Sequence, residues 1–167
     1  MKTIIETERL RLREMSVDDA ALMFEILNEP AFIRYVANRH VHTLDDAAAY
    51  IAEKILPSYA QFGFGFYIVE LKESGTRIGM CGLIKRETLE DVDIGFSILE
   101  PFWGRGYATE AAAAVMHYGL TTLKLPRIIA VTAPDNARSG AVLEKLGLRF
   151  EKMIQVPGYG FESKLFS

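Results

Sequence analysis

The chain reads Pro101-Phe102-Trp103-Gly104-Arg105-Gly106-Tyr107-Ala108-Thr109-Glu110-Ala111 at the point where an apolar run gives way to alanine-rich sequence. The apolar run, Val92 to Leu99, predicts a strand, and the residues from Ala111 to Leu120 predict a helix. Two glycines between them allow unusual dihedral angles and a close approach of the backbone to a ligand. The first helical amides lack partners and, with the helix dipole, form an anion site. The stretch therefore suggests a phosphate-bearing cofactor.

Two well-known phosphate loops do not match this stretch. A P-loop requires G-x-x-x-x-G-K-[ST], which the chain lacks, and a dinucleotide fingerprint requires a third small residue at a place where this loop has none. A lone Gly-x-Gly is also compatible with a tight turn that binds nothing. The loop by itself leaves both interpretations open.

Three segments together resemble the GNAT acyltransferase family. Trp103 to Ala108 is similar to motif A of that family, [QR]-x-x-G-x-[GA], with Trp in place of Gln or Arg. Asn136 to Phe150 resembles motif B, and Glu6 to Arg13 resembles the opening of the RimJ and RimL ribosomal-protein acetyltransferases. The resemblance spans nearly the whole chain in the right order. It implies direct transfer of an acetyl group from acetyl-CoA to a primary amine.

The composition limits the classes of function. At 167 residues we expect one domain, residues 1–167, with a sizeable core, because half of the residues are hydrophobic. A net charge of −3 shows no basic footprint for nucleic acid, and we expect the alternating Arg9, Arg11 and Arg13 to form a solvated strand face. No apolar run reaches the roughly 18 residues of a membrane span, and no signal peptide is evident. We expect a cytoplasmic protein that acts without a membrane partner, with Cys81 as a buried, inert thiol.

The pattern of elements predicts a mixed α/β (α+β) fold, with a mostly antiparallel central sheet flanked by helices. Strands are expected at residues 7–13, 63–71, 77–85, 92–99, 127–133, 148–156 and 161–166. Helices are expected at residues 16–28, 43–59, 109–122 and 139–146. The first two begin with capping boxes, at Ser16 and Thr43, and Pro57 should kink or end the second. The helix at 109–122 makes the strands on either side of it parallel neighbours.

The resemblance implies where coenzyme A binds. Backbone amides from Gly104 to Thr109 would cradle the pyrophosphate, and a side chain at Gly106 would occupy the phosphate's space. Main-chain groups from Phe96 to Ile98 would pair with the pantetheine arm, and an amide there would polarise the thioester carbonyl. We expect the Trp103 ring to pack under the loop. The implied cofactor-binding residues are Phe96, Ser97, Ile98, Trp103, Gly104, Arg105, Gly106, Tyr107, Ala108, Thr109 and Asn136.

Asp93 is the first candidate for acid–base chemistry. Acyl transfer to an amine requires the amine to be unprotonated, and a carboxylate, directly or through water, accepts the proton. Related enzymes often carry Glu at this position, one step before Ile94-Gly95-Phe96. The alternative is a surface carboxylate at a strand start, close to Glu90 and Asp91.

Motif B supplies two further candidates. Asn136 would bond the pantetheine arm, or would serve turn chemistry in Pro134-Asp135-Asn136. Ser139 would cap the helix that follows it, or would give a proton to the departing thiolate, as proposed for RimL-like enzymes. Many family members use a tyrosine one turn further along, where this chain has Leu143. Either Ser139 takes that role or the thiolate leaves without an acid.

The acceptor is the least determined part of the sequence. Residues 28–44, which include His40 and His42, border the acceptor cleft in the resembled fold, and no third ligand suggests a metal. The resemblance favours a protein N-terminal α-amine as acceptor. The alternatives are a small amine (amino acid, polyamine or antibiotic) and a non-catalytic acyl-CoA-binding module. A homodimer is common in the family.

Overall fold

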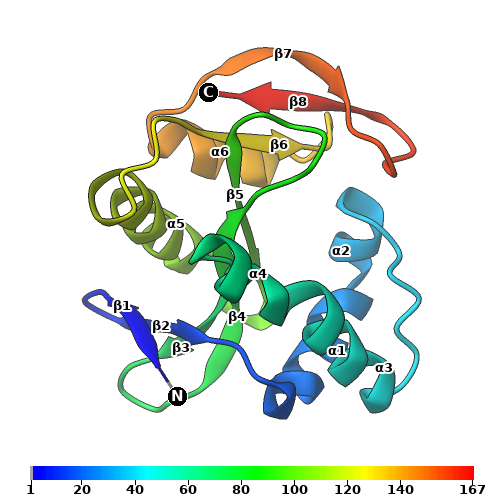
Figure 1. The fold of residues 1–167 in the computed structure, drawn as a ribbon, viewed down its shortest axis with the longest axis vertical. Helices are drawn as coiled ribbons and strands as arrows, with labels where there is room; N and C mark the ends of the chain where they lie inside the picture. Colours follow the sequence, from blue (N-terminus) through cyan, green and yellow to red (C-terminus); the bar gives the residue numbers. More distant parts are fainter. Residues whose placement is uncertain (1) are drawn as a thin grey trace.

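A computed structural model describes residues 2–167 as one eight-stranded sheet in the order β1-β2-β3-β4-β5-β6-β8-β7 (Figure 1). All neighbouring strands are antiparallel except β5 and β6. The strands are β1 (Thr3–Glu6), β2 (Leu10–Glu14), β3 (Phe66–Leu71), β4 (Arg77–Ile84), β5 (Val92–Ile98), β6 (Ile128–Thr132), β7 (Phe150–Gln155) and β8 (Glu162–Phe166). The helices are α1 (Ala20–Asn28), α2 (Pro30–Tyr35), α3 (Leu44–Tyr50), α4 (Leu56–Phe62), α5 (Tyr107–His117) and α6 (Ala137–Lys145). This confirms the predicted mixed, mostly antiparallel sheet flanked by helices.

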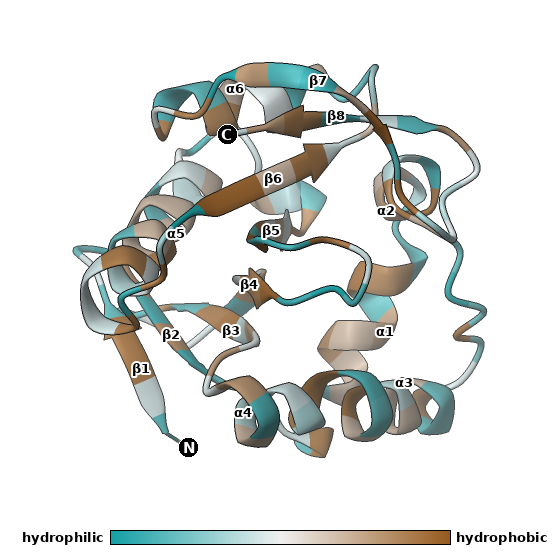
Figure 2. Ribbon diagram, turned by 45° about the horizontal axis from the view of Figure 1, so that its top comes forward, coloured by the Kyte–Doolittle hydropathy of each residue, from teal (hydrophilic) through white to brown (hydrophobic). Residues whose placement is uncertain are grey.

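Two hydrophobic clusters cover the two faces of the sheet. On one face α5 and α6 pack on the central strands, with Ala111, Val115 and Leu143 buried there. On the other face α1 and α3 pack against Ile68 and Met80. Neighbouring side chains of a strand point to opposite faces, so β3 and β4 contribute buried residues to both clusters. Figure 2 shows that β6 is also hydrophobic along most of its length.

Local signals account for most helix boundaries. Both predicted capping boxes are present, Ser16 with Asp19 and Thr43 with Asp46. Pro57 lies in the first turn of α4, and a π-helical turn, Ile51–Ile55, joins that helix to α3, so the predicted kink is confirmed. None of the helices described in residues 2–167 is long and apolar enough to cross a bilayer.

Two elements escaped the sequence prediction. Pro30 ends α1, as expected, but it also begins α2, because proline at the first helical position loses no hydrogen bond. The short strand β1 is the sheet's outer edge and pairs only with β2, so its four residues carry little pattern of their own. Helix α2 matters for the site, because Phe32 and Tyr35 line both cavities described below.

The parallel pair β5 and β6 separates after two residue pairs. Val92 lies opposite Ile128 and Asp93 opposite Ile129, and no pairing follows. On its other edge, β6 pairs with β8 from Ala130 to Thr132. The remainder of β5, from Gly95 to Ile98, keeps β4 on one side and has no strand on the other. Figure 1 shows β5 running between the two groups of strands that this separation creates.

The expectation that Arg9, Arg11 and Arg13 form a solvated face is wrong for Arg13, whereas Arg9 is exposed and Arg11 is partly exposed. Arg13 is 8% exposed and donates two hydrogen bonds to Asp19, at 2.9 and 3.0 Å. Arg77 contacts the same carboxylate at 2.9 Å, and Arg11 and Arg13 share Glu70 across β2 and β3. Alternation along a strand does not reveal such partners, because they come from other elements.

Asp19 should therefore be essential for stability. Burial alone raises its pKa, but hydrogen bonds from Arg13, the Ser16 amide and Arg77 outweigh burial and hold the pKa below its ordinary value. We expect Asp19→Asn to lower the free energy of unfolding by about 3 kcal/mol or more at pH 7, since the buried Arg13 loses the carboxylate that accepts two of its hydrogen bonds and keeps only Glu70 as a charge partner. Urea unfolding measures this loss.

The pH dependence of this loss has a defined sign. A carboxylate with a lowered pKa stabilises the fold above its unfolded-state pKa of about 3.9 and loses that contribution as the pH falls through the lower folded-state value. The difference between wild type and Asp19→Asn should persist at pH 5 to 7 and shrink below about pH 4. The exposed neighbour Asp18 is the control: Asp18→Asn should cost less than about 1 kcal/mol. Equal losses for the two variants would contradict the ion-pair interpretation.

Candidate active site

The glycine loop, residues 103–109, presents a set of backbone amides. Gly104 and Gly106 adopt φ angles of 76° and 80°, in the left-handed region that disfavours side chains. Gly106 is the N-cap of α5, and the amide of Glu110 donates to its carbonyl oxygen at 3.0 Å. The amides of residues 107–109 precede that bond and have no acceptor within the helix. The loop geometry therefore suits an anion, and α5 begins two residues before the predicted start.

Arg9 ties this loop to the β1–β2 turn. Its guanidinium donates to the Arg105 carbonyl at 3.0 Å and to Glu110 at 2.7 Å, and it lies over the Tyr107 ring. The Thr7 hydroxyl reaches the same Glu110 at 2.6 Å. The opening motif thus holds the glycine loop in place, and this link could not be read from either segment alone.

Trp103 anchors the end of β5. Its indole N–H donates to the Ile98 carbonyl at 2.6 Å, its ring packs against the core, and the Arg138 guanidinium lies 3.7 Å above the ring. The expected packing of the ring is confirmed. The Ile98 carbonyl thus has a partner within the protein, whereas Phe96 and Ser97 line open space next to it.

Two adjoining cavities occupy the space that opens between β5 and β6. The larger one, about 230 Å³, extends toward α2, α3 and the β7–β8 loop, and the smaller one, about 120 Å³, extends toward the glycine loop and Trp103. The wall that they share joins the cavity next to the glycine loop to the cavity that contains Asp93. Both are lined by Phe32, Tyr35, Val36, Phe96, Ser97, Asn136 and Ser139.

Asp93 lies at the inner end of the larger cavity. It is 2% exposed, so the alternative of a surface carboxylate is wrong. Its Oδ2 accepts from Arg86 Nε at 3.3 Å, while Oδ1 is buried without a hydrogen-bond partner among the described residues. Burial raises the pKa of Asp93 to about 6, although the Arg86 charge opposes the shift. A carboxylate tuned to this range, with one oxygen free, is suited to accept a proton.

The start of α6 differs from the sequence expectation. Asn136 is the N-cap, since its Oδ1 accepts from the Ser139 amide at 3.3 Å, and the helix begins at Ala137. Ser139 is therefore not the cap, because the capping side chain comes from three residues earlier. Asn136 has its oxygen engaged in the protein, and both residues face the cavities. Leu143, where many relatives carry tyrosine, is buried beside the larger cavity.

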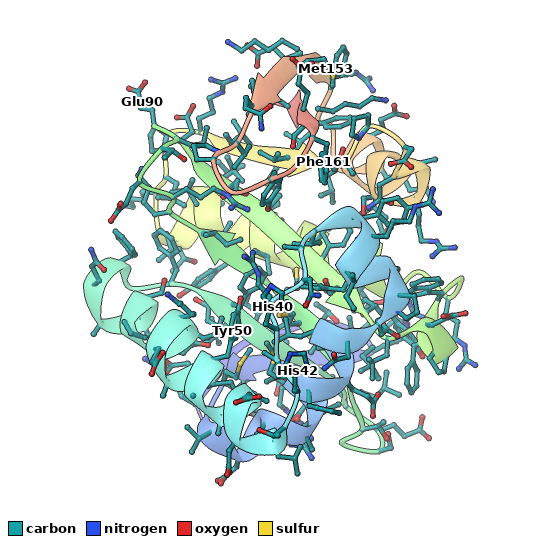
Figure 3. The ribbon with its side chains drawn as sticks, turned by 90° about the vertical axis from the view of Figure 1, so that its right-hand side faces the viewer. His40, His42, Tyr50, Glu90, Met153 and Phe161 are labelled. Carbon is teal, nitrogen blue, oxygen red and sulfur yellow. The ribbon has the colours of Figure 1, made fainter. Side chains whose placement is uncertain are left out.

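Sequence reasoning missed several residues of this site. Arg86 holds Asp93 and also donates to the Tyr159 hydroxyl at 3.1 Å. Tyr50, marked in Figure 3, lines the cavity from α3. No motif flags these residues, since they come from two loops and a helix that only the fold brings together. None of the three histidines lines either of these two cavities, and the described residues contain no group of three or more His, Cys, Asp or Glu suited to a metal ion.

This fold and site define an acyltransferase of the GNAT type, and comparisons with known proteins agree. The model of the acetyltransferase (GNAT) domain matches residues 9–149. YkkB of Bacillus subtilis is 31% identical over 92% of this chain and 90% of its own length. The N-acetyltransferase p20 of Bacillus licheniformis is 30% identical over 89% of this chain and 84% of its own. An acetyltransferase structure from Agrobacterium tumefaciens superposes with a TM-score of 0.82 at 27% identity, covering 99% of this chain and 93% of that one.

The chain belongs to the GNAT acetyltransferase family. It is an acetyl-CoA-dependent N-acetyltransferase, as the sequence resemblance indicated. Its family relationship does not select an acceptor, because ribosomal-protein and small-molecule acetyltransferases both occur among its distant relatives.

The glycine loop can be tested by one substitution. Gly106→Glu would force a side chain onto a residue at φ 80° and place a negative charge where phosphate is expected. We expect coenzyme A affinity to fall by about 100-fold or more, measured by calorimetry. Gly75→Glu is the matched control, because Gly75 has a φ of 73° in a turn with open space around it. Unchanged affinity in Gly106→Glu would remove the loop from the cofactor site.

Proposed function

We propose that residues 1–167 form a single domain that moves an acetyl group directly from acetyl-CoA to a primary amine, with Asp93 as the base. The observation that carries this proposal is the buried carboxylate with one unpartnered oxygen at the cavity between the separated strands. A binding module without catalysis has no use for such a carboxylate, whose isolation from water is unfavourable. The proposal includes a cytoplasmic setting, where a buried lone thiol such as Cys81 stays reduced.

The residues present fit acetyl-CoA. The free amides of the glycine loop suit the pyrophosphate, with Arg105 close by, and the unpaired edge at Phe96 and Ser97 suits the amide-bearing pantetheine arm. Acetyl-CoA supplies the activated acetyl thioester. Ser97 and its neighbours exclude water and offer main-chain donors to the thioester carbonyl.

Two protons have to move during the reaction. Asp93 takes one from the incoming ammonium, so that the amine is free to attack. Attack leaves a second proton to be lost from the acylated nitrogen. Ser139, at the wall shared by the two cavities, gives a proton to the departing thiolate and regains one from that nitrogen. Leu143 has no proton to donate, so Ser139 is the candidate acid. Because a thiolate is a weak base, protonating it is less critical than deprotonating the amine.

For the acceptor we propose a protein N-terminal α-amine. The [ribosomal protein uS5]-alanine N-acetyltransferase of Escherichia coli is 34% identical over 93 residues, 54% of this chain. A small amine is the second candidate, since the FsC-acetyl coenzyme A-N(2)-transacetylase of Aspergillus fumigatus is 26% identical over 152 residues. Acetyl-CoA turnover, followed as free thiol, against N-terminal peptides, amino acids, polyamines and aminoglycosides separates the two.

Asp93→Asn tests the base. We expect turnover to fall by about 100-fold or more, with coenzyme A affinity unchanged within about twofold, because the side chain would act on the proton and not on the cofactor. Wild-type turnover at saturating substrates should rise with pH through about 6, since the carboxyl is protonated below that pKa and accepts no proton. The variant should lack this step.

The control is Asp91→Asn, two residues earlier, whose carboxylate pairs with Arg127 away from both cavities. Its turnover should stay within about twofold of wild type. If Asp93→Asn turns over at the wild-type rate, Asp93 is not the base.

A further inference from the structure

The charge of the larger cavity is opposite in sign to that of the whole chain. The net charge is −3, yet the cationic side chains lining this cavity are Arg39, Lys54 and Arg86, and Asp93 is the one carboxylate among the described residues that line it. Arg86 and Asp93 neutralise each other as an ion pair. Glu29 and Arg138 line the smaller cavity instead, on the side of the glycine loop.

Arg39 and Lys54 remain without a charge partner. Within residues 2–167, neither has a carboxylate oxygen within 4.0 Å. Both are exposed, Arg39 on the segment after α2 and Lys54 on the π-helical turn after α3. They therefore lie at the mouth of the cavity, whereas Asp93 lies at its buried end.

Tyr50 connects the two ends of the cavity. Burial raises the pKa of its hydroxyl, and the positive charges of Arg39 and Arg86 oppose that shift. Figure 3 shows this face of the molecule, with Tyr50 and His40 on it and Phe161 of the β7–β8 loop above them. A group that reaches Asp93 from outside passes Arg39 and Lys54, which form a cationic rim around the mouth of the cavity.

We propose that the acceptor carries a carboxylate in addition to its primary amine, with the amine directed to Asp93 and the carboxylate on the side of Arg39 and Lys54. This inference rests on the proposed function and names its substrate class. An acceptor with one positive charge and no anion adds to an existing excess of two, and a polyamine or aminoglycoside adds more. An acceptor with a carboxylate offsets that excess and receives charge-assisted hydrogen bonds.

Two sources present this chemistry: a free α-amino acid, and a peptide N-terminus followed by an acidic residue. Calorimetry with coenzyme A-loaded protein distinguishes them. One arm compares α-amino acids with their primary amides. The other compares the peptide amides Ser-Asp-Gly-NH2, Ser-Asn-Gly-NH2 and Ser-Lys-Gly-NH2. We expect the carboxylate-bearing member of at least one arm to bind about tenfold tighter or more than its neutral partner.

The double variant Arg39→Gln, Lys54→Gln should reduce this preference to about twofold or less while leaving coenzyme A affinity unchanged. The matched control is Lys145→Gln, Arg149→Gln, which removes two exposed positive charges that line neither cavity. It should keep the wild-type preference. Retention of the preference in the first variant would show that other groups select the acceptor.

Each proposal has its own readout. Equal binding of acids and amides, tighter binding of spermidine, or no binding by any carboxylate-bearing acceptor overturns the charge inference, whatever the turnover. Selective binding without any thiol release from acetyl-CoA supports the charge inference and overturns the proposed acetyl transfer. Acetylation of neutral and acidic acceptors with equal KM leaves the transferase proposal standing and overturns the charge inference.

Discussion

The separation of β5 from β6 is the constraint on which the rest of the site depends. A parallel pair that continued beyond Asp93 and Ile129 would consume the main-chain edge at Phe96 and Ser97 and close both cavities. On the edge of β6 that faces away from β5, strand β8 pairs with residues Ala130 to Thr132, so β6 stays part of the sheet after it separates from β5. Trp103 and residues at the start of α6 line the smaller cavity in the opening.

Two buried aspartates in this chain have pKa values that are shifted in opposite directions. Both oxygens of Asp19 have partners from Arg13, and Arg77 and the Ser16 amide add to them, so its pKa is lowered. Asp93 has one distant partner and one free oxygen, so burial dominates and its pKa is raised. Full pairing stabilises a fold, whereas partial pairing leaves a group able to exchange a proton.

Charge is also distributed on a finer scale than the composition shows. The acidic chain surrounds a cavity whose unpaired charges are positive, at Arg39 and Lys54. Since charges act strongly over a few ångströms and are screened beyond about 10 Å at 0.1 M salt, we expect Arg39 and Lys54 to influence the choice of acceptor more than the net charge does.

The sequence by itself determined the features that depend on short stretches: the glycine loop, both capping boxes, the kink at Pro57 and most strands of the sheet. Backbone dihedral preferences and side-chain periodicity depend on residues that are close in sequence, so the sequence is enough to predict the features that they produce. Tertiary structure alone decided that β5 and β6 separate, that α2 covers the opening and that Arg86 meets Asp93. Those outcomes depend on burial and on charge pairing between residues far apart in sequence, which are properties of the folded chain.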